Sequence, residues 1–121
     1  MNRHVRIAGP AALALFLAAA TICGAMFDGY SHREHPLALL GASGVPGALV
    51  FNASAFVLPG LAAAIALWSM RSGLSATTDV WTRIGTQLTV LSALAFAAQG
   101  FLPLDADDVT GPANAMHALA W

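Results

Sequence analysis

The sequence has no lysine, one cysteine and few charged residues of either sign. Charged residues make up 9% of the chain and hydrophobic residues 58%, whereas a soluble domain carries about a quarter charged residues. So little charge cannot cover a surface that faces water. The apolar excess therefore needs another environment, and the lipid bilayer is the expected partner.

The remaining shortages exclude several classes of function. With a formal net charge of −1, the chain has no basic patch suited to nucleic acid. The single Cys23 excludes an intramolecular disulfide and a cysteine metal cluster. No G-x-S-x-G, Walker loop, H-E-x-x-H or C-x-x-C-H motif occurs. No cofactor is therefore expected.

Three apolar stretches are long enough to cross a membrane as helices. They cover about residues 7–27, 49–70 and 80–102. A spanning helix needs roughly 20 mostly apolar residues, and a helix satisfies its own backbone polar groups in lipid. None of the three alternates with the period of two that is typical of a strand. The prediction is an all-α transmembrane helix bundle of one domain, with three spanning helices plus the start of a fourth.

The first span has a second interpretation. The short basic start "MNRHVR" and the small residues of "ICGAM" fit a secretory signal peptide. A signal peptide has an apolar core of about 7–15 residues. Because this run is longer, a retained helix is favoured.

Small residues and a proline mark where helices pack and bend. Pro59 removes a helical hydrogen bond from the second span, which a membrane helix tolerates when its neighbours satisfy the freed group. Gly60 and Ala64, four residues apart, let another helix approach closely, as do Ala93 and Ala97 on the third span. The alternative is ordinary packing of an alanine-rich helix.

Capping and aromatic residues fix the ends of the spans. Thr78 or Asp79 can cap the third span by accepting from its free N–H groups. Trp68 and Trp81 lie where an interfacial aromatic belt would place them. Pro103 ends the third span.

The arginines predict the orientation, because positive charge stays on the cytoplasmic side. Four of them flank the N-terminus or the connection between the second and third spans, namely Arg3, Arg6, Arg71 and Arg83. The other two connections contain Arg33 alone among basic residues. The chain is thus predicted to be a multi-pass protein of the inner (cytoplasmic) membrane, with its N-terminus cytoplasmic and residues 28–48 and 103–115 outside.

The last eleven residues, "GPANAMHALAW", resemble the entry of a further helix. A Gly-Pro turn precedes Asn114, a candidate cap, and an apolar run follows from about residue 114. The run is too short to cross a membrane. We expect the chain to be the N-terminal fragment of a longer protein. The alternative is an interfacial tail anchored by Trp121.

Polar residues gather at one predicted depth on the outer side. They are Asp28, Asn52, Gln99, Asp105 and His117. Polar groups in a span are costly and usually face protein or water, so these residues predict an outward-facing pocket that binds or passes a small polar or lipid headgroup ligand. Two alternatives stay open. One is a membrane-embedded hydrolase or transferase that uses Asp105 and His117. The other is an accessory subunit without a ligand, which assembles with itself or with membrane partner helices.

Two histidines in the first outer loop offer a weaker metal hypothesis. His32 and His35 stand three residues apart, a spacing that can bring two imidazoles to one ion, with Asp28 as a third ligand. The alternative is that these two histidines and the aspartate are ordinary polar residues of a loop at the membrane interface. The acidic run 105–108 lacks the register and terminal Glu of a calcium loop.

An ordered set of segments resembles a known membrane family. The segments are "YSHREHPLALLGASGVPGALVFNASAFVLPGLAAA", "QGFLPLDADD" and "MHALA". They are similar to the bacterial and archaeal family known as domain of unknown function 998. The matching residues are Leu40, Gly41, Gly44, Asn52, Phe56, Gly60, Gly100, Phe101, Pro103, Asp105 and His117. The resemblance implies a multi-helix membrane protein of about six spans, of which this chain is the N-terminal half. It implies no activity, because the family has none assigned.

Overall fold

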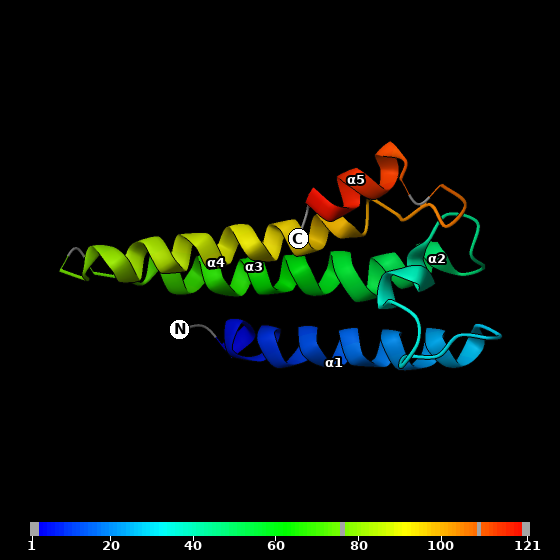
Figure 1. Ribbon diagram of the computed structural model, residues 1–121. Coiled ribbons are helices and arrows are strands. Elements are labelled where there is room, and N and C mark those ends of the chain that lie inside the picture. The colour runs from blue at the N-terminus through cyan, green and yellow to red at the C-terminus, as the bar shows by residue number, and fades with distance from the viewer. Residues whose placement is uncertain (1–2, 76, 109, 120–121) are drawn as a thin grey trace.

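The structure is a computed structural model that describes residues 3–75, 77–108 and 110–119 (Figure 1). Within those ranges the chain is helical and contains no strand. The elements are α1 (Arg3–Met26), η1 (Leu37–Gly41), α2 (Ala48–Phe51), η2 (Asn52–Val57), α3 (Leu58–Ser72), α4 (Val80–Gln99) and α5 (Pro112–Leu119). The all-helical fold predicted from the sequence is confirmed.

Three long helices lie side by side, and each runs nearly antiparallel to the one before it in the chain (Figure 1). Because α2, η2 and α3 follow without a break, they form one continuous helix, Ala48–Ser72. Its α3 part lies between α1 on one side and α4 on the other (Figure 1). The short helix α5 turns back over the end of α4 (Figure 1).

In the part of the chain that the structure describes, two helices are long and apolar enough to cross a membrane. They are Arg6–Met26, with 21 residues, and Ala48–Ser72, with 25 residues. With 20 residues α4 is also long enough, but its first half carries Arg83 and Gln87 among several threonines, so it is less apolar. The prediction of three spanning helices is therefore not confirmed, although the third helix lies where the sequence predicts it.

The helix Ala48–Ser72 widens just before its proline. In a regular α-helix the ring of Pro59 would clash with the carbonyl group of Ala55. The residues of η2, Asn52–Val57, instead form a π-helical turn, and such turns are a common cause of helix bending. The sequence predicts the disturbance at Pro59 but not its form.

Small residues let α3 and α4 approach at backbone distance. A Cβ atom placed on Gly60 would lie 2.7 Å from the backbone nitrogen of Ala97. Farther along, a Cβ atom on Gly100 would lie 2.8 Å from the carbonyl oxygen of Asn52. Of the small residues predicted to mediate helix packing, Gly60 and Ala97 thus lie at the contact between α3 and α4.

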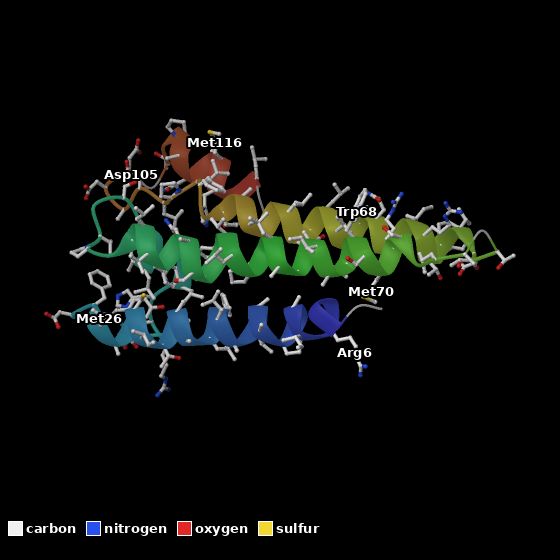
Figure 2. The ribbon with its side chains drawn as sticks, turned by 180° about the vertical axis from the view of Figure 1, so that it is seen from behind. Arg6, Met26, Trp68, Met70, Asp105 and Met116 are labelled. Carbon is white, nitrogen blue, oxygen red and sulfur yellow. The ribbon has the colours of Figure 1, made fainter. Side chains whose placement is uncertain are left out.

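The two ends of the bundle differ in character. One end, which we call the loop-rich end, is formed by residues 27–47, 100–108 and 110–111; Asp105 lies in it and Met26 lies beside it in Figure 2. The opposite end, which we call the hairpin end, is formed by residues 71–75 and 77–83, and Arg6 and Met70 lie toward it (Figure 2). The hydrophobic core lies toward the loop-rich end, where Leu40, Phe51 and Phe56 are buried.

Candidate functional site

The site is covered by α5, which is held in place by Asn114. The backbone N–H of Asp105 donates to Asn114 Oδ1 at 2.7 Å. Asn114 Nδ2 donates in return to the carbonyl oxygens of Asp105, at 2.9 Å, and Asp108, at 3.1 Å. Because the helix already begins at Pro112, a residue type favoured in the first turn, Asn114 is free to tie α5 to the preceding loop instead of capping it.

The loop below α5 is organised by the carboxylate of Asp105. Its Oδ1 accepts from the backbone N–H groups of Asp107, at 3.0 Å, and Asp108, at 3.3 Å, a local turn that aspartate commonly makes. The backbone N–H of Ser43 donates to the carbonyl oxygen of Leu104 at 2.7 Å. The two loops of the loop-rich end are therefore joined to each other.

The buried side chain of His117 points from α5 into the protein. It is 5% exposed, and its Nδ1 lies 2.6 Å from the carbonyl oxygen of Leu102. A carbonyl oxygen only accepts, so Nδ1 is the donor and carries the proton. The other ring nitrogen, Nε2, is buried without a hydrogen-bond partner among the described residues. In the neutral ring Nε2 is a free acceptor.

His117 lines a cavity of about 380 Å³. The lining residues are Phe16, Pro36, Leu37, Ala38, Phe56, Phe96, Leu104 and His117. They come from α1, the segment around η1, η2, α4, the loop after α4, and α5. A mostly apolar cavity of this size with one polar group is typical of a small-molecule site.

Aromatic rings brace the walls of this cavity. The ring of Phe96 on α4 lies 6.0 Å from that of Phe16 on α1 and 5.3 Å from that of Phe56 on η2, in edge-to-face arrangements. Phe56 in turn meets Phe51 edge to face at 5.6 Å. Such pairs stabilise by about 0.5–1.5 kcal/mol beyond the area that they bury, so they hold the three helices around the cavity.

Asn52 and Gln99 are buried, as their predicted role requires, but they face protein. Asn52 Nδ2 donates to the carbonyl oxygen of Gly41 at 2.9 Å, so it fixes η1 to the long helix. Gln99 is 2% exposed, and its Oε1 has no hydrogen-bond partner among the described residues. Neither side chain lines the cavity below α5.

The five predicted ligand-binding residues are therefore used in different ways. His117 lines the cavity, whereas Asp105 organises the loop above it. Asp28 is exposed after the end of α1. The two residues of the enzymatic alternative bond to different groups: His117 Nδ1 donates to the carbonyl oxygen of Leu102, and the Asp105 carboxylate accepts from backbone N–H groups.

The two loop histidines flank Tyr30. A hydrogen bond of 3.1 Å joins the hydroxyl group of Tyr30 and His32 Nδ1, and the ring of His35 stacks on Tyr30 at 5.8 Å. The backbone N–H of Ser31 donates to His35 Nδ1 at 3.1 Å. Burial raises the pKa of the Tyr30 hydroxyl group. Within the described ranges, no group of three or more His, Cys, Asp or Glu side chains could hold a metal, so the metal site stays a prediction without a third ligand.

The apolar walls are the part of the site that sequence reasoning missed. Phe16, Phe56 and Phe96 lie far apart in the sequence, and no local motif connects them. A usable signal was present: each phenylalanine lies in the half of its helix that is nearer to the loop-rich end. Aligning the three spans by their predicted depth in the membrane would have placed the three phenylalanines at a similar level.

Comparison with known proteins finds no family model, no curated protein and no solved structure that matches the chain.

Proposed function

We propose that the protein is an integral membrane protein that binds a small amphipathic molecule in the cavity below α5. The observation that carries the proposal is His117, which lines an otherwise apolar cavity and whose buried Nε2 atom has no hydrogen-bond partner among the described residues. A buried polar atom without a partner is costly. A ligand that supplies a hydrogen bond removes that cost.

The surface of the helices supports the membrane part of the proposal. In the most apolar stretch of each helix, 22% of the residues of α1 and 39% of those of Ala48–Ser72 are buried inside the protein. Large side chains such as Leu13, Ile65 and Leu88 are at least half exposed, at 60%, 64% and 57%. A monomeric soluble protein rarely exposes apolar patches of this extent, whereas lipid is the natural surrounding for such helices.

The distribution of charge supports an orientation with the N-terminus in the cytoplasm. Arg71 and Arg83 lie at the hairpin end, toward which Arg6 also lies, whereas five of the six acidic residues lie at the loop-rich end. By the positive-inside rule, the hairpin end faces the cytoplasm across the inner membrane. In this orientation α4 is the third spanning helix, and its polar first turns lie at the cytoplasmic interface, which accounts for their composition.

The protonation of His117 defines the chemistry of the ligand. With its proton on Nδ1, the neutral ring offers Nε2 as an acceptor. The ligand therefore brings a hydroxyl or amide N–H donor on an apolar body that packs against the phenylalanine rings. A lipid-like alcohol or phenol fits this description.

The test is to weigh the protein with its ligand still bound. The chain is taken from its native membrane in mild detergent and analysed by native mass spectrometry, as wild type, His117→Phe and the matched control His32→Phe. We expect a reproducible bound species with a hydroxyl or N–H group on the wild type and on His32→Phe. His117→Phe, which keeps an aromatic ring but removes the acceptor, should lose it.

Two outcomes would contradict the proposal. Equal loading of the wild type and His117→Phe would mean that His117 does not hold the ligand. A wild-type chain without any bound species would favour the accessory-subunit alternative. The resemblance to the domain of unknown function 998 remains part of the membrane proposal and adds no activity to it.

A further inference from the structure

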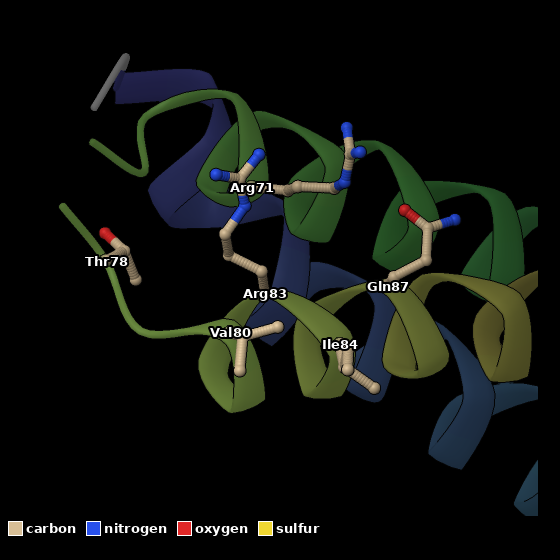
Figure 3. A pocket seen from close by; sticks show the side chains of 6 residues that line it. All are labelled: Arg71, Thr78, Val80, Arg83, Ile84 and Gln87. Carbon is tan, nitrogen blue, oxygen red and sulfur yellow. The ribbon is translucent and has the colours of Figure 1, made fainter. Parts of the chain in front are cut away.

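A second hollow, which contains two arginines, lies at the hairpin end between α3 and α4. It measures about 460 Å³ and is lined by Arg71, Thr78, Val80, Arg83, Ile84 and Gln87 (Figure 3). Figure 3 shows the guanidinium groups of Arg71 and Arg83 and the amide of Gln87 over the same stretch of the two helices. This hollow is at the opposite end of α4 from the cavity below α5.

Two positive groups share this hollow. Arg71 and Arg83 also line a smaller hollow of about 90 Å³ with Leu74, so their side chains lie close together although they come from different helices. Like charges at short range repel each other. The guanidinium of Arg71 lies 5.0 Å from the ring centre of Trp68, a cation–π contact that holds it in place.

Nearby carboxylates do not neutralise the pair. Asp79 is the acidic residue nearest to it in the sequence, and its carboxylate caps α4 by accepting from the backbone N–H and the hydroxyl group of Thr82. The other acidic residues lie at the loop-rich end. The hollow therefore presents two positive charges together with the hydroxyl group of Thr78 and the amide of Gln87, which suits an anion.

An apolar groove continues from the hollow along the same face. It measures about 260 Å³ and is lined by Leu61, Ala64, Ile65, Trp68, Ser69, Val90 and Leu94. Along α4, Gln87 of the hollow is three residues before Val90 of the groove, and Leu94 follows four residues later. Residues three and four apart lie on one helix face. The charged hollow and the groove thus form one strip along the α3–α4 pair.

We propose that this strip binds an anionic phospholipid, with its phosphate group between Arg71 and Arg83 and an acyl chain in the groove. Guanidinium groups pair with phosphate through two parallel hydrogen bonds. The inference rests on the membrane orientation proposed above, which places the hairpin end at the cytoplasmic surface, where anionic lipids attract arginine. It does not depend on the cavity below α5.

The test compares lipids that share a phosphate group. The detergent-solubilised full chain is incubated with phosphatidylglycerol, phosphatidylcholine or water-soluble glycerol 3-phosphate, and retention is measured by native mass spectrometry. The variants are Arg71→Gln, Arg83→Gln and their combination. The matched control is Arg33→Gln, which removes the same charge from an exposed position at the loop-rich end. Circular dichroism verifies that each variant is folded.

We expect phosphatidylglycerol to be retained more strongly than phosphatidylcholine. Each single arginine variant should weaken that retention about fivefold and the combination about 25-fold, while Arg33→Gln leaves it unchanged.

Equal retention of the two lipids, or wild-type retention by the double variant, would overturn the inference. Equally strong binding of glycerol 3-phosphate would identify a soluble phosphate ligand instead of a lipid. If alkaline carbonate releases the protein from its membrane, the proposed function itself fails; if only lipid selectivity is missing, this inference alone fails.

Discussion

The contact between Gly41 and Asn52 gives the sharpest stability prediction. Asn52 donates to the carbonyl oxygen of Gly41 at 2.9 Å in a buried position. A Cβ atom on Gly41 would overlap the amide oxygen of Asn52. The substitution Gly41→Ala should therefore push the amide away and break the hydrogen bond that joins η1 to the long helix.

The expected loss of stability has two causes, which are overpacking at Gly41 and the loss of the hydrogen bond from Asn52. Overpacking of a buried site costs about 1–3 kcal/mol, and a buried carbonyl that loses its partner costs about 1–3 kcal/mol. These costs overlap, because moving the amide relieves the clash at the expense of the bond. We expect Gly41→Ala to lower the free energy of unfolding by about 2 kcal/mol. In an Asn52→Ala background, which removes the three atoms nearest to the added Cβ, the same change should cost little.

The assay is a double-mutant cycle on the detergent-solubilised protein, with unfolding followed by circular dichroism as denaturing detergent is added. The expected coupling energy between Gly41→Ala and Asn52→Ala is about 1–2 kcal/mol. Ser54→Ala is the matched control, because the hydroxyl group of Ser54 donates a hydrogen bond to the carbonyl oxygen of Val50 within the same long helix and not to η1. If Gly41→Ala costs the same in both backgrounds, the proposed packing of η1 on Asn52 is refuted.

Three further predictions concern helix contacts and a helix start. Gly60→Leu should separate α3 from α4 at Ala97 and cost about 2 kcal/mol or more in the same denaturation assay; a neutral result would count against the close approach. Gly85→Ala, where a Cβ atom meets nothing within 4 Å, should stabilise α4 by about 0.5–1 kcal/mol, and a loss of stability would show that this face is occupied. Hydrogen bonds from Thr82 lower the pKa of the Asp79 carboxyl group from its ordinary value of 3.8. Its stabilisation of the helix start is therefore present above that value and lost as the pH falls through the folded pKa. The NMR shift of the Thr82 amide should follow this titration in the wild type and lose it in Asp79→Asn.

The long helices could be predicted from the sequence, because the signals that define a helix lie in residues that are neighbours in the chain. Apolar runs, Asp79 as the cap of α4 and Pro103 after its end follow from neighbouring residues, and the structure places α4 at Val80–Gln99 with Asp79 as its cap. The widened turn at Asn52–Val57 was not predicted. Pro59 signals a disturbance, but which carbonyl groups rearrange depends on the helices packed around them.

The candidate site was harder to predict, because its contacts join distant segments. The Asn52 partner is a backbone carbonyl eleven residues away, which no side-chain pattern reveals. His117 was selected by its depth, and in the structure it is buried. Depth alone could not separate a residue that lines a cavity, such as His117, from one enclosed by protein, such as Asn52. That distinction depends on the rotation of each helix about its axis.

The most direct test of the account is the accessibility of the two ends of the bundle in intact cells. In a Cys23→Ala background, single cysteines are introduced as Ser43→Cys at the loop-rich end and Ser75→Cys at the hairpin end. A membrane-impermeant thiol reagent should label Ser43→Cys in intact cells and Ser75→Cys after lysis alone. Labelling of Ser75→Cys in intact cells would contradict the orientation, and release of the protein by alkaline carbonate would contradict its insertion in the membrane.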